Sequence, residues 1–486
     1  MPLPRQAAGR TRGRRGPGHA AHRTIGRRAL VHGGAGLIGG VLLGTGYVLG
    51  RWRPDDDMED LGGGRLRLLT GRDDTANGQR GLLVDQWNLL HPRHQVEVVE
   101  LPGVADLQYS AMHAALQSGD PNVDAVNLDI AWIAEFAEAG YLRELERVDT
   151  DGFLDGPLEA GRIDGRLLAL PFNTDVGMLY YRVGEDPTAG ELRPEDAEAI
   201  TDWAELRRLA AGMALSGGFD GGIAMQLDAY EGFTVNVWEY LLANGVEPDV
   251  DDGAMDFAED GRAVAYLGRL WEDLRPEGDG PPVILWDSLR FGEDASLAAF
   301  REGRTPFLRH WPRAYRVLSS CELGFTVGAV PMPGRVLGGQ NLAVSAASRA
   351  PNATRRLIEF LTGPAAQQLL FERGGFAATR DEPFYDAAAQ TAGLEEAVGC
   401  DDGTGPRGDA AQLFKALTGS VPWLPDESEV APPGHRPAVT RYTRYSRVFQ
   451  EVVHPLLLNG EPLDSDSEAS GLSDLAGRLE DASAGK

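Results

Sequence analysis

Residues 167–182 place two short apolar runs on either side of a polar core, and this stretch restricts the fold more than any other part of the chain. The runs Leu167–Phe172 and Val176–Tyr181 each have the length of a buried strand, and neither continues at helical spacing. Pro171 has no backbone N–H for a central strand ladder, so we expect the chain to change sheet or direction there. A carboxylate between two buried strands is costly unless it is hydrogen-bonded. The stretch therefore predicts either a strand that crosses between two lobes, with Asp175 facing a cleft, or a hairpin with a solvated turn.

The length of the chain and its charge restrict the protein to a few classes. At 486 residues the chain exceeds what one hydrophobic core usually supports, so we expect two or three lobes. Hydrophobic residues make up 42% and charged residues 24% of the chain, as in ordinary soluble globular proteins. The net charge of −27 argues against a nucleic-acid partner, because phosphates require a basic face.

The N-terminus combines a basic segment with an apolar run. Residues 1–28 are rich in arginine, and the uncharged run 29–50 is about 22 residues long, enough to cross a bilayer as a helix. Acidic residues follow between Asp55 and Asp60, so we expect the N-terminus in the cytoplasm and the bulk of the chain outside. The run is either a signal peptide or an uncleaved anchor. The protein is therefore expected to be secreted or anchored to the outer face of the cytoplasmic membrane, with residues 51–64 as a linker.

Cys321 and Cys400 are the two cysteines of the chain. They are too few for a metal site built on paired thiolates, so we expect no metal centre. In an exported chain, a disulfide between them is favoured over two unpaired buried thiols.

Strand and helix patterns alternate from Arg65 onward. Strand-like apolar runs cover residues 66–70, 96–101 and 123–128, and amphipathic helix patterns lie between and after them. This alternation predicts an α/β fold with a parallel sheet, in which ligands bind beyond the carboxyl ends of the strands. Asp73, Asp74 and Asp129 follow such strand ends. At the other end of the chain, the polar residues beyond Leu463 are expected to form a frayed tail.

Several further stretches occur in an order that is typical of one family. They are Gly71–Gly78 before Asp85–Asn88, Asp124–Asp129 before Glu135–Leu142, Leu170–Asp175, Tyr230–Phe233, Arg309–Pro312, Gly338–Asn341, and Arg436-Pro437 before Tyr442. In this order they resemble the extracellular solute-binding proteins of bacterial ABC importers, in particular the carbohydrate group with the trehalose- and maltose-binding proteins. The resemblance covers nearly everything from Arg65 to Pro462, and it rests on the whole set of stretches.

The resemblance implies an α/β periplasmic-binding-protein-like fold, in which two lobes joined by hinge crossings close on a ligand in the cleft between them. The predicted division assigns residues 65–172 and 333–378 to lobe 1, residues 173–332 and 379–462 to lobe 2, and residues 463–486 to a polar tail. In such proteins the counterpart of residues 167–182 carries the chain between the lobes. The resemblance thus favours the crossing strand over the hairpin.

The chemistry of sugars explains why certain residue types would gather in such a cleft. Sugar hydroxyls pair with carboxylates and amides, and the apolar C–H faces of a sugar ring pack against aromatic side chains. Expected acceptors are Asp73, Asp74, Asp129, Asp175 and Glu231, expected donors are Asn173, Arg309, Gln340 and Asn341, and expected stacking rings are Tyr230 and Trp311, with Trp423 as a further candidate. The family match aligns Asp74, Asp129, Asp175, Glu231 and Trp311 best with ligand-contacting positions.

Most of these residues also have a purely structural alternative. Asp73 or Asp74 can cap the helix that follows, so we expect only one of the two at the ligand. Asp129 and Glu231 can likewise cap the helices after them, and Trp311 can belong to a core between the lobes.

Two positions depart from the pattern of the carbohydrate relatives. Many relatives have an aromatic residue where Gln340 stands, and another after Pro312, where this chain has Arg313. The loss of two rings weakens the case for the usual stacking of a disaccharide, and it leaves room for a more polar or differently shaped ligand.

The leading hypothesis is a monomeric receptor, without a cofactor, that captures an oligosaccharide and delivers it to ABC permease subunits. Its N-terminal helix would hold it at the cytoplasmic membrane. A glycosidase built on two of the carboxylates is a second hypothesis, although the chain has no serine-hydrolase, zinc-protease or phosphate-loop motif. A third hypothesis keeps the fold but changes the ligand to a peptide, polyamine or metal chelate, or changes the role to that of an anchored sensor.

Overall fold

The computed structural model describes residues 58–246, 261–276, 278, 280–319, 323–391, 407–424, 429–437, 439–459 and 466–484. Those from Met58 onward belong to one compact unit. Cys321, Cys400 and the N-terminal run 29–50 lie outside the described residues, so the disulfide and the membrane anchor stay predictions. Within the described segments, no helix combines the length and the apolarity that crossing a membrane requires.

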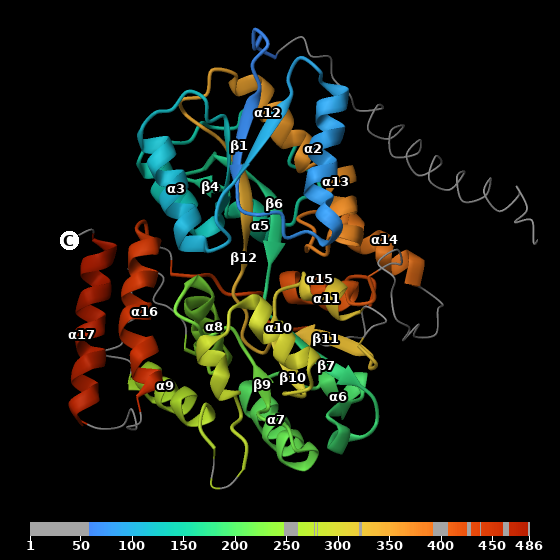
Figure 1. Cartoon of the computed structure of the whole chain (residues 1–486), viewed down its shortest axis with the longest axis vertical. Helices are drawn as coiled ribbons and strands as arrows, with labels where there is room; N and C mark the ends of the chain where they lie inside the picture. The colour runs from blue at the N-terminus through green and yellow to red at the C-terminus, as the bar shows by residue number, and fades with distance from the viewer. Residues whose placement is uncertain are drawn as a thin grey trace, which may run out of the picture. The chain divides into compact units, whose positions relative to one another are not determined.

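The first sheet contains five strands in the order β2-β1-β3-β12-β6. Figure 1 labels β1, β6 and β12 among them. They are β1 (Leu66–Thr70), β2 (Val96–Glu100), β3 (Ala125–Asp129), β6 (Ala169–Asp175) and β12 (Gly338–Val344). β1 runs parallel to both β2 and β3, because helices α2 (Gln79–Leu90) and α3 (Ala105–Gln117) return the chain between them. β12 is antiparallel to β3 and to β6. The predicted α/β alternation is therefore confirmed.

Both faces of the first sheet are buried. Leu66 and Leu68 of β1 point to one side and join a core with Trp87 of α2, whereas Leu69 joins a second core with Met112 of α3. Such two-sided burial accounts for the nearly continuous apolar runs of these strands. Further helices of this part are η3 (Ile130–Trp132), α4 (Ile133–Glu138), α5 (Asp155–Glu159), α12 (Pro351–Leu361) and α13 (Pro364–Leu369). We call this sheet with its helices the first half.

The second sheet has the order β11-β7-β10-β9. In addition, β8 pairs with the last two residues of β7, Arg182 and Val183. Its strands are β7 (Met178–Val183), β8 (Glu191–Leu192), β9 (Ile223–Ala224), β10 (Phe307–His310) and β11 (Val327–Pro331). Its helices are α6 (Pro194–Glu198), α7 (Trp203–Gly217), α8 (Glu231–Ala243), α9 (Gly261–Asp273), α10 (Glu293–Arg301), α11 (Ala314–Leu318), α15 (Ala410–Thr418) and α16 (Tyr442–Leu458). β7 is antiparallel to its neighbours β10 and β11. We call this sheet with its helices the second half.

The chain crosses between the two sheets directly after β6. β6 belongs to the first sheet and the next strand, β7, to the second, so the crossing-strand prediction is confirmed and the hairpin is excluded. The prediction that the chain changes sheet or direction at Pro171 is wrong. Pro171 lies inside β6, opposite Asn341, where the pairing with β12 shifts register. A proline is accommodated there because β6 is the edge strand of its sheet and the ladder is locally irregular.

A second crossing runs from β11 to β12 through residues 332–337, and the segment before α16 pairs with it through the bridge between Val336 and Gly434. The first crossing falls after Asp175, later than the predicted lobe boundary between residues 172 and 173. The division into lobes with these boundaries stays a prediction.

The C-terminal region is helical where a frayed polar tail was expected. Helix α17 (Asp466–Ser483) packs along α16, as Figure 1 shows, and Leu475 and Leu479 are fully buried against it. Leucines four residues apart lie on the same helix face, so even this polar segment has an apolar stripe to bury. The remaining elements are η2 (Ala76–Gly78), β4 (Arg162–Ile163), β5 (Arg166–Leu167), η4 (Pro187–Ala189), η5 (Trp286–Arg290), η6 (Leu370–Gly374) and α14 (Glu382–Thr391).

Candidate functional site

Three neighbouring strands of the first sheet bring predicted site residues into one row. Gln340 on β12 pairs with Asp129 on β3 at one side and with Asn173 on β6 at the other. Asp175 lies further along β6, opposite Gly338, and shares a face with Asn173 because alternate residues of a strand point the same way. Asn173 Nδ2 donates a hydrogen bond to Asp175 Oδ2 at 3.1 Å. Strand register thus gathers four of the predicted residues.

Arg436 links this row to the second half. Its Nη2 donates to Oδ1 of Asp129, and its Nη1 donates to Oε1 of Glu231 at 3.0 Å. Glu231 is the first residue of α8, so the ion pairs join the end of a first-half strand to the start of a second-half helix. Asp129 Oδ1 also accepts the backbone N–H of Ala131 at 2.9 Å. The carboxylate of Asp129 therefore caps the next helix, as its structural alternative predicts, and makes an ion pair as well.

Glu231 is held by three donors. Besides Arg436, the hydroxyls of Tyr442 and Ser446 on α16 donate to it at 2.6 and 2.7 Å. Burial raises the pKa of Glu231, and the positive charge of Arg436 acts in the opposite direction. Sequence reasoning missed Arg436, Tyr442 and Ser446 as site residues. The stretch from Arg436 to Tyr442 was among the family motifs, but no spacing rule shows that it returns to Asp129, 307 positions away.

The carboxyl group of Asp175 lies in a field of mixed charge. Burial and, to a smaller extent, the negative charge of Asp129 together raise the pKa of Asp175 to about 7. The charges of Arg313, Arg309 and Arg436 favour the ionised form and act in the opposite direction. Asp175 therefore interacts electrostatically with charged residues of both halves, and it titrates near neutral pH.

We expect the substitution Asp175→Asn to flatten the dependence of stability on pH. Between the ordinary pKa of 3.8 and the folded value of about 7, the folded protein keeps a proton that the unfolded chain releases. Stability is therefore lost as the pH rises through this window, and the cost is complete above it. The variant should gain stability over the wild type at about pH 8 and gain little at about pH 4.5. Urea unfolding at several pH values measures this; parallel curves for the two proteins would contradict it.

Arg309 does not lie in the row with Gln340, and its contact with a ligand stays a prediction. Its side chain is fully buried in the second half, where Nε donates to Glu239 Oε2 at 2.7 Å. The guanidinium stacks on the ring of Trp311, with 3.6 Å between Cζ and the ring centroid. Trp311 follows β10 and is partly exposed, so Arg309 lies behind the ring as a support.

Asn341 also lies outside the row, and its contact with a ligand likewise stays a prediction. It neighbours Gln340 on β12 and therefore points to the opposite face of the sheet. There it is fully buried, and its Nδ2 donates to the carbonyl oxygen of Pro157 at 3.4 Å. By contrast, Tyr230 directly precedes Glu231 and is partly exposed, so it stays a candidate for ligand contact.

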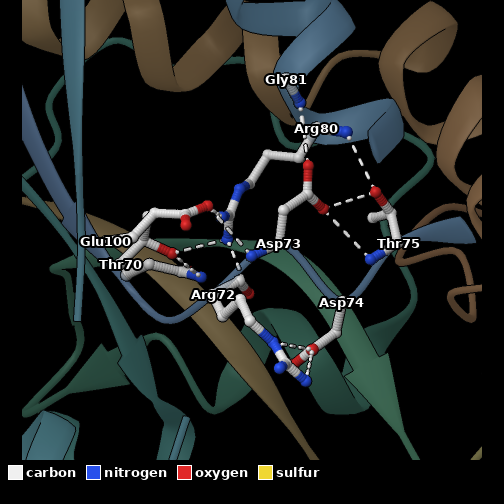
Figure 2. A network of polar contacts seen from close by, with 9 residues as sticks. Thr70, Arg72, Asp73, Asp74, Thr75, Arg80, Gly81 and Glu100 are labelled. Atoms are coloured by element: carbon white, nitrogen blue, oxygen red, sulfur yellow. Dashed lines mark hydrogen bonds and ion pairs between the residues drawn. The ribbon is translucent and has the colours of Figure 1, made fainter. Parts of the chain in front are cut away.

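Asp73 and Asp74 lie at the end of β1, and Figure 2 shows their contacts. Asp73 accepts hydrogen bonds from the backbone N–H groups of Thr75 and Gly81, both at 3.1 Å, so it caps the start of α2. Asp74 is exposed and forms an ion pair with Arg72 at 3.2 Å. In the described part of the chain, neither carboxylate forms a hydrogen bond or ion pair with Asp129, Glu231 or Arg436. Asp73 thus fulfils the capping alternative, and contact of Asp74 with a ligand stays a prediction.

Two further predictions concern features outside the row, namely Trp423 as a stacking ring and the expectation of no metal centre. Trp423 packs against Tyr385 and Phe414, with ring centroids 4.8 and 4.9 Å apart, in the core cluster around α15. The residues that the structure describes contain no group of three or more histidine, cysteine, aspartate or glutamate side chains that would hold a metal ion.

The model of the bacterial extracellular solute-binding protein family matches residues 90–394 of the chain. The chain belongs to this family. The match includes Asp129, Asp175, Glu231, Trp311 and Gln340, and it ends before Arg436.

Two curated relatives of this solute-binding protein are named as components of ABC transporters. The "probable ABC transporter-binding protein" of Deinococcus radiodurans is 26% identical over 290 residues, which cover 56% of this chain and 66% of the relative. The "probable amino-acid ABC transporter periplasmic-binding protein y4oP" of Sinorhizobium fredii is 25% identical over 274 residues, which cover 53% and 60%. The chain thus spans less than two thirds of the length of either relative.

Solved structures with different ligands share the fold of this solute-binding protein. The maltose-bound MalE3 of T. maritima has a TM-score of 0.68 at 23% identity, over 85% of this chain and 98% of that one. UgpB of Mycobacterium tuberculosis, in complex with glycerophosphocholine, has a TM-score of 0.63 at 16% identity, over 86% and 98%. These likenesses confirm the predicted two-lobe α/β fold.

Proposed function

We propose that this solute-binding protein is the substrate-binding component of an ABC sugar importer, and that it binds an oligosaccharide between its halves by hinge closure. The observation that carries the proposal is the convergence of polar residues from both halves. The first half contributes Asp129 and Asp175, and the second contributes Glu231 and Arg436, which joins Asp129 to Glu231. Trp311 stacks on Arg309, whose charge also acts on Asp175.

The proposed chemistry follows from what each group offers. Asp129 and Glu231 form ion pairs with Arg436, and carboxylate oxygens accept hydrogen bonds from sugar hydroxyls. The partly exposed ring of Trp311 offers an apolar face for the C–H groups of a sugar ring. Because Gln340 is also partly exposed within the row, we expect a ligand with more polar contacts than ring stacking alone would select.

We expect ligand-dependent stabilisation when the purified protein is screened against mono-, di- and oligosaccharides by thermal shift. A ligand at one hundred times its dissociation constant adds about 2.7 kcal/mol to the free energy of unfolding. The substitution Trp311→Ala should remove most of the ligand-induced shift, because the stacking face is lost. The matched control is Trp423→Ala, which should lower the melting temperature but keep the ligand-induced shift. Absence of any shift across the panel would refute the sugar proposal.

A receptor for a different polar solute is the second candidate, and it is favoured by Gln340 and Arg313, which stand where the family resemblance implies aromatic residues. Amino acids, polyamines and glycerophosphocholine belong in the same screen, and a shift with one of these alone would select this candidate. We further propose that the protein is not an enzyme and acts as a monomer, held at the cell surface or secreted, that delivers its solute to permease subunits. Release of reducing ends from an oligosaccharide would instead support the glycosidase hypothesis.

A further inference from the structure

The ring of Trp311 rests on a buried support. The guanidinium of Arg309 lies 3.6 Å from the ring centroid, and the hydroxyl of Tyr180 donates to the carbonyl oxygen of Trp311 at 3.1 Å. Trp311 directly follows β10 and lies in the loop before α11. A ring on a loop needs such contacts to stay in one orientation.

Arg309 itself has little freedom to move. Nε donates to Glu239 at 2.7 Å, Nη1 donates to Gln226 Oε1 at 2.9 Å, and both charged side chains have no exposed surface. Gln226 in turn donates to the hydroxyl of Ser296 at 2.7 Å and to the carbonyl oxygen of Arg309 at 2.8 Å. A buried ion pair is a weak source of stability, because removing both charges from water offsets much of their attraction. The pair is therefore weak evidence for a contribution to stability.

Glu239 connects this support to both crossings between the sheets. Its Oε1 accepts the backbone N–H of Val336, in the second crossing, at 3.3 Å. In the first crossing, a Cβ placed on Gly177 would lie 2.5 Å from the same oxygen, so the two groups are in close contact. The carboxylate of Glu239 therefore contacts Arg309 and both crossing segments.

We propose that Arg309 and Glu239 are positioning residues, which hold the ring of Trp311 for the ligand and tie it to the two crossing segments. This role rests on the proposed function, because it assumes that the ligand packs on Trp311. A ring that is already fixed loses less side-chain entropy when a ligand stacks on it. The same pair transmits a shift of the ring to Val336, where the chain passes from one half to the other.

The test needs no ligand, so its result is independent of which solute the protein binds. The nine tryptophans are labelled with 5-fluorotryptophan, and Trp311→Phe identifies the fluorine NMR signal of Trp311. In the double variant R309M/E239L, which removes both charges together, we expect the Trp311 signal to shift and broaden. The signal of Trp87, in the core of the first half, should stay unchanged and serves as the internal control. Hydrogen exchange in residues 332–337 should become about tenfold faster, because Val336 loses its acceptor.

The variant R309K separates the two parts of the proposal. Lysine keeps a charge for Glu239 but has no planar group to stack, so the Trp311 signal should move while exchange in residues 332–337 stays slow. An unchanged Trp311 signal in both variants would overturn the positioning role. Movement of all tryptophan signals together would also overturn it, because the pair would then stabilise the whole core rather than position the ring of Trp311.

Discussion

The substitution Arg436→Met should destabilise the protein by about 3–5 kcal/mol at neutral pH, because it leaves two carboxylates without their buried partner. The side chains of Arg436, Asp129 and Glu231 are 5%, 16% and 11% exposed, so water cannot replace the lost guanidinium. Loss of the cation also removes the positive charge that lowers the pKa of Glu231, so this pKa rises further. The destabilisation should therefore be largest at high pH and shrink as Glu231 takes up a proton on acidification. Urea unfolding followed by circular dichroism at about pH 8 and about pH 5 measures both effects.

Arg441 provides the control for this experiment. It lies just before α16, as Arg436 does, but it is exposed. Arg441→Met removes the same charge, and we expect it to change the free energy of unfolding by less than about 0.5 kcal/mol. Equal effects of the two substitutions would show that net charge matters rather than the bridge between Asp129 and Glu231.

The substitution Gly339→Ala is expected to cost about 2–5 kcal/mol and to disturb the row of site residues. Gly339 has φ of +123°, which L-residues rarely adopt, and a Cβ there would lie 2.3 Å from the carbonyl oxygen of Asn173 and 2.7 Å from Cα of Thr174. Both are backbone atoms of β6 and cannot rotate away, so β12 and β6 would have to separate. Because Gln340 and Asp175 sit on these strands, the proposed ligand-induced shift should fall as well.

Gly338 is the matched control on the same strand. A Cβ there would lie 3.4 Å from Cβ of Asp175, an ordinary van der Waals contact. We expect Gly338→Ala to stay within about 1 kcal/mol of the wild type. If the two variants were equally stable, the close approach of β12 to β6 would not constrain the site.

Local sequence patterns predicted much of the fold. The apolar runs that became β1, β2 and β3 were recognisable from their length and their separation by amphipathic helices. Residues 167–172 and 176–181 were also predicted as strands, and they overlap β6 and β7, whereas the crossing between them was favoured over a hairpin only by the family resemblance. Pro171 misled the prediction, because a local rule about proline does not reveal that β6 is an edge strand opposite a register shift. The C-terminal helix α17 was not predicted, because its few leucines stabilise it only by packing against α16.

The candidate site was predicted less completely. Asp129, Asp175 and Glu231 were selected as acceptors, and the structure brings all three into contact or electrostatic interaction with Arg436. Asn341 was selected as an amide donor in the family stretch Gly338–Asn341, but strand alternation turns it to the face opposite Gln340.

The sequence by itself determined the α/β class and the family, because these depend on patterns within short windows and on their order along the chain. Only the tertiary structure decided which side chains share a site. Register placed Asp129, Gln340 and Asn173 in one row, and the return of the C-terminal segment brought Arg436 to Asp129 across 307 positions. Such contacts depend on how separate elements pack, and burial in that packing raises the pKa of Asp175 to about 7.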